Sequence, residues 1–442
     1  VRIYGNINSI PKTITKLKLK GQAPRRIILA EDRINGPQVR DILKISNKLG
    51  LSLAKLPKIT DFKDDIDKAT IKPIAIEDLL GRAQNKPFQG RREEFVKGKN
   101  ILVTGAGGTI GSELVRQIAS YNPSSLTLIE ISEYNLYKID KELESNFPEV
   151  VKSCYIGDVR NKELLEDVFL RESPDLVFHA AALKHVPIVE NNLIEAASIN
   201  VIGTKNVVDM CIKHKTDKMV MISTDKAVNP SSLMGVTKRV AECYIQGIKH
   251  FYPKTSTNFS TVRFGNVLGS SGSVIPLFQS QLENNGPITV THPDMIRYFM
   301  TVPEAVELVL QASTLNSKVK KESPVFVLDM GDPVRIYDLA VQMIKLAGLR
   351  PNEDIKIVFT GIRPGEKLYE ELFYKSETEE KTIYEGITQA HNAELSHTEI
   401  NSTVKKIQDI CEKRDYRQLL QLLVDIVPEY NPNPSPDLEK AA

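Results

Sequence analysis

The 442-residue sequence has few of the features that mark several protein classes. Its four cysteines lie far apart and form no Cys-x-x-Cys pair or Cys/His cluster, so we expect neither a disulfide framework nor a metal site. A formal net charge of +2 lacks the basic excess typical of nucleic-acid binding. No apolar run reaches the roughly 18 residues of a membrane span, and no signal-peptide pattern opens the chain. These absences favour a globular protein of a reducing cytoplasm.

The length of the chain predicts more than one domain, because ordinary domains have roughly 100 to 200 residues. Residues 1–60 contain a strand, a helix with apolar spacing and a second strand, which indicates a partial α/β domain. Residues 61–99 lose this periodicity and are typical of a linker. Since the chain begins with Val1, we expect it to be a piece of a longer protein.

Short apolar runs alternate with helical patterns from Asn100 onward, which predicts an α/β fold with a doubly wound parallel sheet of the Rossmann type. We place this domain at residues 100–375 and expect it to include a smaller C-terminal substrate lobe. Residues 376–442 are expected to form a helical extension that ends in a Pro-rich, disordered tail.

A glycine-rich turn follows the first run of this domain, with glycines at Gly105, Gly108 and Gly111. Glycine at these positions allows a tight turn, close approach of the backbone to a pyrophosphate and close contact of helix and sheet. Such a turn alone is weak evidence, but here it stands between a strand and a helix. The pattern predicts a dinucleotide site.

Two acids define the expected nucleotide more closely. Glu130 ends the second run, where a carboxylate can accept from a ribose hydroxyl and would repel a 2′-phosphate, so we expect NAD. The alternative is a solvated strand end, because Ser132 and Glu133 can also cap the next helix. Asp158 ends the third run and is expected to contact the adenine, although it is also an ordinary residue at the start of a helix.

The usual catalytic pair of this scaffold is incomplete. Enzymes of this type carry Tyr-x-x-x-Lys, in which the lysine lowers the pKa of the tyrosine. Here Met234 stands at the tyrosine position and Lys238 follows one helical turn later. A thioether cannot act as a base, so Met234 alone would be read as a core residue. Upstream, however, Thr224, Asp225 and Lys226 place a hydroxyl, an acid and an amine at the carboxyl end of an apolar strand.

Together these stretches resemble a known family. The segments TGAGGTIGSELVRQI, HAAALKHVP, STDKAVNPSSLMGVTKR, VRFGNVLGSSGSVIPLF and RPGEKLYEEL are similar to the UDP-N-acetylglucosamine 4,6-dehydratases of polysaccharide biosynthesis. These are extended short-chain dehydrogenases, and the methionine at 234 resembles their long, membrane-anchored, configuration-retaining branch. The resemblance covers residues 100–375.

The resemblance implies how the residues act. Thr224 would orient the sugar 4-hydroxyl, and Lys238 would hold the cofactor ribose and assist loss of the hydroxyl proton. Lys226 would remove the C5 proton and Asp225 would protonate the leaving C6 hydroxyl, for which a paired acid and amine are suited. The alternative for this pair is a surface ion pair. The expected cofactor contacts also include Thr109, Ile110, Val159, Ala180 and Ala182.

Substrate residues are implied in the same way. Asn266, Arg297, Arg363 and Glu366 resemble the positions that hold the UDP group, and guanidinium groups suit a diphosphate. Read without the resemblance, each arginine is a solvated surface charge. Lys184 is expected to line the pocket beside His185, and a structural role is equally open.

The resemblance also implies the substrate, the partners and the location of the protein. We expect UDP-N-acetylglucosamine as the substrate, no nucleic-acid partner, a homo-oligomer, and a place in surface polysaccharide or glycan synthesis. The full-length protein would hold this cytoplasmic domain at the inner face of a bacterial membrane, through a region before Val1. Two alternatives remain, a nucleotide-sugar 4-epimerase or decarboxylating relative, and a non-catalytic NAD-binding scaffold.

Overall fold

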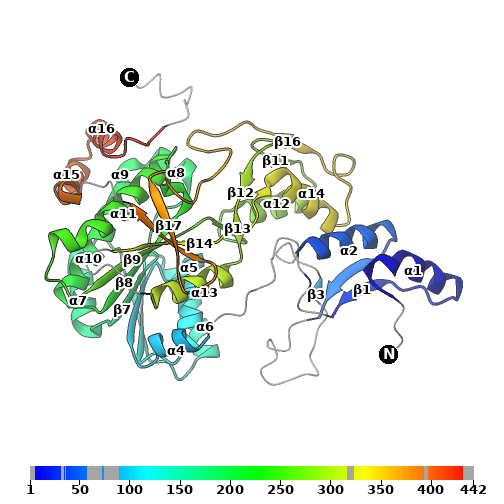
Figure 1. The fold of residues 1–442 in the computed structure, drawn as a ribbon, viewed down its shortest axis with the longest axis horizontal. Coiled ribbons are helices and arrows are strands. Elements are labelled where there is room, and N and C mark those ends of the chain that lie inside the picture. The colour runs from blue at the N-terminus through cyan, green and yellow to red at the C-terminus, as the bar shows by residue number, and fades with distance from the viewer. Residues whose placement is uncertain are drawn as a thin grey trace. The chain divides into compact units, whose positions relative to one another are not determined.

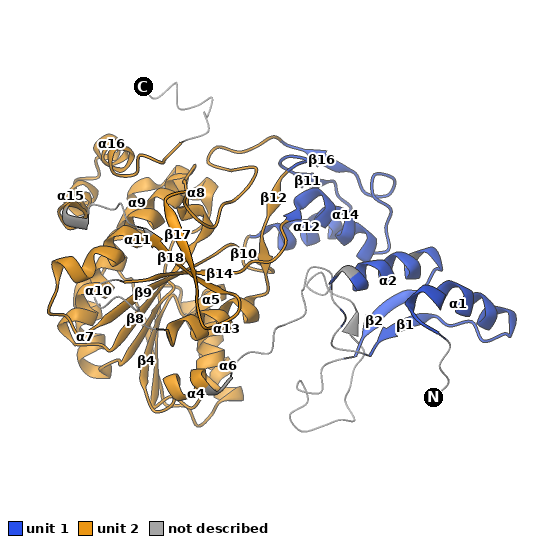
Figure 2. Ribbon diagram, in the orientation of Figure 1, with its two compact units in different colours: residues 1–86, 273–294, 334–360 blue, residues 87–272, 295–333, 361–442 orange. Residues whose placement is uncertain are grey.

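The computed structural model describes residues 5–30, 34, 36–56, 72–73, 89–315, 323–392 and 397–431. The chain divides into two compact units (Figure 2). Unit 1 consists of residues 1–86, 273–294 and 334–360, and unit 2 of residues 87–272, 295–333 and 361–442. Most of the predicted linker and the predicted disordered tail beyond Asn431 lie outside the described residues.

Unit 2 is built on a nine-stranded sheet with the order β17-β18-β14-β9-β8-β7-β4-β5-β6 (Figure 1). The strands from β14 to β6 in this order pair in parallel, and β18 and β17 are added antiparallel. The parallel strands are β4 (Asn100–Thr104), β5 (Ser125–Glu130), β6 (Lys152–Ile156), β7 (Leu176–His179), β8 (Lys218–Thr224), β9 (Asn258–Phe264) and β14 (Val325–Leu328). The order confirms the predicted doubly wound sheet.

The inner strands β4, β7 and β14 are buried on both faces, which explains why they are continuous apolar runs. Successive side chains alternate between two cores: Leu102 and Val177 face one, while Val103 and Phe178 face the other. The first core includes residues of α7 (Lys162–Glu172), α10 (Thr204–Lys213), α11 (Leu233–Phe251), α15 (His397–Lys413) and α16 (Tyr416–Ile426). The second includes residues of α4 (Gln89–Val96), α5 (Thr109–Ala119), α6 (Glu133–Asn146) and α13 (Val302–Ser313).

Several of these helices begin at a side chain that satisfies a free backbone donor. Ser132, Asn161 and Ser232 accept from the backbone N–H three residues later and cap α6, α7 and α11. Shorter helical turns connect the elements near the carboxyl edge of the sheet. They are α8 (Val186–Glu190), α9 (Leu193–Ala197), the π-helix Ser198–Gly203 and the 3-10 turn Asp225–Ala227.

Two boundaries in unit 2 differ in detail from the predicted pattern. Helix α4 occupies part of the predicted linker 61–99, and its Val96 is fully buried in a core. The sheet also continues beyond residue 375, because β18 (Ile387–Asn392) pairs with β14 and β17 (Glu377–Lys381) pairs with β18. The domain limits themselves stay predictions.

Unit 1 contains the strand–helix–strand pattern predicted near the start of the chain. Here α1 (Ile10–Leu19) precedes β1 (Arg26–Leu29), α2 (Gly36–Lys48) and β2 (Ser52–Lys55), and β1 and β2 pair in parallel. The later segments of this unit form α12 (Val274–Glu283), β11 (Ile288–Val290), α14 (Ile336–Leu346) and β16 (Ile357–Phe359), with β11 parallel to β16.

A buried ionic network fastens β17 to the parallel sheet. Arg263 on β9 binds Glu242 of α11 at 2.8 Å and Glu377 of β17 at 3.0 Å, and all three side chains are 0% exposed. A second cation, Arg239, lies 3.8 Å from Glu242 and stacks over the ring of Tyr374. The two carboxylates therefore balance two buried guanidinium groups.

The substitution Glu377→Gln removes one of these charges without changing the shape of the side chain. We expect a loss of about 3 kcal/mol in the free energy of unfolding, because a broken buried pair leaves an uncompensated charge. Denaturant unfolding measures this loss. Glu379→Gln is the matched control, since Glu379 is exposed on the same strand. Equal stability of the two variants would contradict a structural role for the network.

Candidate active site

The predicted site residues follow several parallel strands at their carboxyl ends. The glycine-rich turn follows β4, Glu130 ends β5, Ala180 follows β7, Thr224 ends β8 and Asn266 follows β9. Parallel strands bring their carboxyl ends to one edge of the sheet, and the strand order reverses between β4 and β7. Ligands of doubly wound sheets bind at such a switch point.

The glycine-rich turn has no room for side chains at two of its positions. Gly105 has a φ of 65°, and a Cβ there would lie 2.8 Å from the backbone of Ala181. A Cβ on Gly111 would lie 1.9 Å from the carbonyl oxygen of Gly105. Helix α5 begins at Thr109 with Gly108 as its N-cap, so the first backbone N–H groups, including that of Ile110, lack intrahelical acceptors. This geometry suits an anionic pyrophosphate.

Glu130 is buried, which argues against the alternative of a solvated strand end. Its carboxylate accepts from the backbone N–H of Gly107 at 2.9 Å and of Ser132 at 3.0 Å. A carboxylate has about four acceptor positions, so both oxygens can still accept from further donors such as ribose hydroxyls. Ser132 separately caps α6.

Asp158 and its neighbours lie beyond β6. The carboxylate of Asp158 binds the guanidinium of Arg160 at 2.6 Å; although burial acts to raise the pKa of Asp158, this pairing holds it below its usual range. Asn161 caps α7, so Asp158 is not the capping residue. Val159 is buried, and its carbonyl accepts from Asn206. Of the two predicted contacts after β7, Ala180 is half-buried and Ala182 is exposed.

A buried histidine that the sequence did not single out lies behind the glycine-rich turn. His179 Nδ1 lies 2.7 Å from Thr104 Oγ1, and Nε2 lies 3.0 Å from Thr204 Oγ1. The Thr204 hydroxyl donates to the carbonyl of Asn200, so it accepts from Nε2–H, and Nδ1 accepts from Thr104. Burial, assisted by the charge of Lys238, lowers the pKa of His179 to about 3. The ring is therefore neutral.

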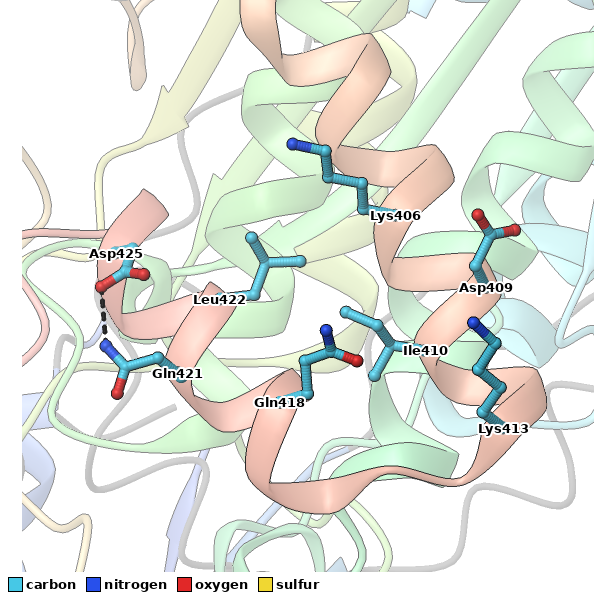
Figure 3. Close-up of a pocket in the computed structure, with 8 residues that line it drawn as sticks. All are labelled: Lys406, Asp409, Ile410, Lys413, Gln418, Gln421, Leu422 and Asp425. Carbon is cyan, nitrogen blue, oxygen red and sulfur yellow. Dashed lines mark hydrogen bonds between the residues drawn. The ribbon is translucent and has the colours of Figure 1, made fainter.

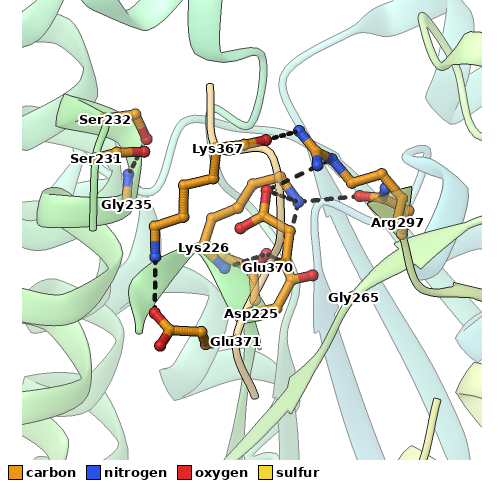
Figure 4. Close-up of polar contacts among 12 residues, drawn as sticks. Asp225, Lys226, Ser231, Ser232, Gly235, Gly265, Arg297, Lys367, Glu370 and Glu371 are labelled. Atoms are coloured by element: carbon orange, nitrogen blue, oxygen red, sulfur yellow. Dashed lines mark hydrogen bonds and ion pairs between the residues drawn. The ribbon is translucent and has the colours of Figure 1, made fainter. Parts of the chain in front are cut away.

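The turn after β8 brings the expected acid and amine together (Figure 4). Lys226 Nζ donates to Asp225 Oδ1 at 3.0 Å and to Asn266 Oδ1 at 3.0 Å, and Thr224 Oγ1 donates to Asp225 Oδ1 at 2.9 Å. Asp225 is fully buried, which argues against a surface ion pair. Its Oδ2 has no hydrogen-bond partner among the described residues, and a Cβ on Gly265 would lie 2.8 Å from it.

Helix α11 carries the two remaining catalytic candidates. Lys238 Nζ donates to the carbonyl of Ile222 at 2.7 Å. Burial lowers the pKa of Lys238 to about 8, against the opposing charge of Glu242. Met234 is buried in the core that α11 forms with α7 and α10, as expected if it is a core residue. Among the described residues, the hydrogen bonds and ion pairs of Asp225 and Lys226 do not include Met234.

Arg297 is brought to the same cluster, but Arg363 is not. The buried guanidinium of Arg297, on β12 (Ile296–Arg297), donates to the carbonyls of Lys367 and Leu368 at 2.7 and 3.2 Å, so it is no solvated surface charge. Arg363 is exposed, and its backbone N–H donates to Glu366 at 3.5 Å. Lys184 and His185 are exposed in the loop after β7.

Glu370 is the residue that sequence reasoning missed at this site. Its buried carboxylate lies 3.7 Å from Lys226 Nζ and 3.6 Å from Arg297 Nε (Figure 4). It belongs to the stretch RPGEKLYEEL, but nothing in this stretch distinguishes Glu370 from the neighbouring acids Glu366 and Glu371.

Other features of the described residues lie apart from this cluster. An open hollow of about 350 Å³ lies between α15 and α16 (Figure 3), and none of the predicted site residues line it. All four cysteines are free thiols. Within the described ranges, no helix combines the length and apolar character that a membrane crossing requires.

The neutral His179 has a consequence for stability that can be measured. The unfolded histidine gains a proton below its ordinary pKa of about 6.5, whereas the folded one stays neutral down to about pH 3. The free energy of unfolding therefore falls with pH below about 6.5, by about 1.4 kcal/mol between pH 7.5 and 5.5 from this group. Denaturant unfolding of the protein and of His179→Gln at both pH values isolates this contribution. An unchanged pH dependence in the variant would contradict it.

Comparison with known proteins places this geometry in a family. The chain is 44% identical over 409 residues to the capsular polysaccharide biosynthesis protein CapD of Staphylococcus aureus, a match that covers 92% of this chain and 66% of CapD. It is 34% identical over 275 residues to a UDP-N-acetylglucosamine 4,6-dehydratase (inverting) of Campylobacter jejuni, covering 62% of this chain and 77% of that protein. It is also 33% identical over 286 residues to a UDP-glucose 4-epimerase of Rickettsia bellii, covering 63% and 79%.

A solved structure supports the same fold over most of its length. The structure of Pen from Bacillus thuringiensis matches with a TM-score of 0.61 and 35% identity, covering 68% of this chain and 91% of Pen. The chain spans 66% of the length of CapD. Residues 101–392 match the family model described as polysaccharide biosynthesis protein, and the chain therefore belongs to that family.

Proposed function

We propose that the chain is an NAD-dependent 4,6-dehydratase that converts UDP-N-acetylglucosamine to a UDP-4-keto-6-deoxy-N-acetylhexosamine. The observation that carries this proposal is the buried pair of Asp225 and Lys226 at the carboxyl end of β8. Loss of water across C5 and C6 needs one group that takes a proton and one that gives a proton. The Campylobacter jejuni relative is a UDP-N-acetylglucosamine 4,6-dehydratase, which supports this proposal.

The residues around the glycine-rich turn fit an NAD molecule. Gly105 and Gly111 have no room for a Cβ, so neither position can place a side chain between the N-terminus of α5 and a pyrophosphate. Glu130 would accept from the ribose hydroxyls and would repel a 2′-phosphate, which favours NAD over NADP. When bound, NAD would take hydride from C4 of the sugar and return it to C6.

The first step would oxidise C4. Thr224 would orient the 4-hydroxyl, and Lys238 would receive its proton as hydride leaves. Since burial lowers the pKa of Lys238 to about 8, a substantial fraction of this amine is neutral near neutral to mildly alkaline pH. The ketone then makes the C5 hydrogen acidic.

The second step would eliminate water. Lys226 and Asp225 share one proton, and the form with a neutral amine and a protonated carboxyl is the reactive one. Lys226 would take the C5 proton, the C5–C6 double bond would form, and Asp225 would give its proton to the leaving C6 hydroxyl. Hydride returning to C6 and the proton of Lys226 returning to C5 complete the product. The pair has then lost its shared proton to the water released, and it would regain one as Lys238 gives up the proton that it took from the 4-hydroxyl.

The substrate would be held by Arg297, Arg363, Glu366 and Asn266, with Lys184 at the mouth of the site. We propose retention of configuration at C5, in line with Met234 in place of a catalytic tyrosine. Synthesis of a surface polysaccharide or glycan, a cytoplasmic location at the membrane and a homo-oligomer complete the proposal.

A 4-epimerase is the second candidate, because a UDP-glucose 4-epimerase is nearly as similar as the dehydratase. Epimerisation reverses C4 alone and needs no acid and base at C5 and C6. The dehydratase reaction therefore requires Asp225 and Lys226 as acid and base, whereas the epimerase reaction does not.

Incubation with UDP-N-acetylglucosamine in deuterated water tests the proposal. We expect a product 18 mass units lighter before isotope incorporation, with deuterium at C5, because the C5 proton exchanges on Lys226. A parallel reaction in ordinary water, read by proton NMR, gives the C5 configuration. Lys226→Met is the control: it should keep its bound NAD and lose dehydration by at least about 100-fold. A C4 epimer as the product would favour the epimerase, and an unchanged sugar would overturn the substrate assignment.

A further inference from the structure

The segment from Gly365 to Tyr374 is tied to the turn that carries Asp225 and Lys226. Ser231 Oγ donates to the carbonyl of Gly365 at 2.9 Å. Lys367 Nζ donates to the carbonyl of Val228 at 2.9 Å, and the hydroxyl of Tyr374 donates to the carbonyl of Ala227. Figure 4 shows Lys367 and Glu370 of this segment beside Lys226. Because these contacts come from residues before and after Glu370 in the sequence, they fix the segment that carries Glu370 against the catalytic turn.

Glu370 lies between two cations inside this arrangement. Its side chain is 4% exposed, and one oxygen, Oε1, faces both Lys226 and Arg297. A buried carboxylate is stable only when it is paired, and these two cations supply the pairing. The proposed reaction gives Glu370 no step, so its burial here calls for another role.

The charged groups that face Lys226 are Asp225, Glu370 and Arg297. Burial acts to lower the pKa of Lys226, the two carboxylates act to raise it, and Arg297 opposes them; the result is a raised pKa. Asp225 Oδ1 accepts a hydrogen bond from the ammonium of Lys226 at 3.0 Å, and Glu370 Oε1 lies 3.7 Å from the same nitrogen. Removal of Glu370 would leave Lys226 with a single carboxylate partner.

We propose that Glu370 is a positioning residue that holds Lys226 against Asp225 and decides how readily that amine releases its proton. The inference rests on the proposed function, because the proton on Lys226 matters only if this amine acts on C5. Glu370 also contacts Arg297, which is assigned to the diphosphate, and so connects Arg297 to the pair of Asp225 and Lys226. Glu370 itself touches no reacting atom.

The test compares Glu370→Gln with Glu371→Gln in the full chain, measuring kcat for dehydration from pH 5.5 to 9.5. Glu371 is a matched control because it is the next residue and its exposed carboxylate accepts from Asn229 and Lys367 instead. We expect Glu370→Gln to lower kcat by about 10- to 100-fold, as misplacement of a catalytic group does. The loss of activity at alkaline pH should begin at lower pH than in Glu371→Gln, because removal of a neighbouring negative charge makes the proton shared by Lys226 and Asp225 easier to lose.

Glu370→Asp carries the test if Glu370→Gln does not fold. It keeps the charge on a shorter side chain, so kcat should fall while the alkaline limb stays closer to that of the unaltered protein. A pH profile of Glu370→Gln that matches that of Glu371→Gln, or full kcat in Glu370→Asp, would overturn the inference about Glu370 and leave the proposed function standing. Absence of dehydration by the unaltered protein would instead overturn the proposed function.

Discussion

The burial of charge at the carboxyl edge of the parallel sheet is the constraint on which the rest of this structure depends. Asp225 is fully buried beside Lys226, and neither group is stable there without partners. Asn266, Glu370 and Arg297 supply those partners from other parts of unit 2. The sheet can place an acid and an amine together only because these segments converge on the same turn.

A second buried network extends this constraint. Tyr374 donates to the carbonyl of Ala227 in the turn Asp225–Ala227, and its ring lies under the guanidinium of Arg239. Its backbone N–H donates to Glu377, which binds Arg263 on β9. The chain after Arg363 and Glu366 is thus bound to the sheet by charge as well as by apolar packing. A rigid support of this kind suits a reaction in which small displacements are costly.

The parts of the fold that arise from local patterns were predictable. Apolar runs buried on both faces identified the parallel strands, and the spacing of Gly105 and Gly111 identified a turn that excludes side chains. Thr224, Asp225 and Lys226 are consecutive, so their placement at one strand end could be read directly. The roles assigned to these residues, and to the cofactor and substrate positions, stay predictions.

Features that depend on contacts between distant segments were not predictable. Glu370 follows Lys226 by more than a hundred residues, and nothing in its local sequence indicates burial. His179 is read from sequence as one more strand residue, and its partners Thr104 and Thr204 come from separate elements. β17 and β18 carry mostly polar residues, and only the pairing of β18 with β14, and of β17 with β18, gives them a place in the sheet.

The central claim is that one site oxidises C4, eliminates water and returns the same hydride to C6. UDP-N-acetylglucosamine carrying deuterium at C4 tests it most directly, with the position of the label in the product read by NMR. The account predicts deuterium at C6 of a 4-keto-6-deoxy sugar, within the molecule that supplied it. Deuterium that remains at C4 of a sugar with an intact 6-hydroxyl would contradict the account and indicate an epimerase.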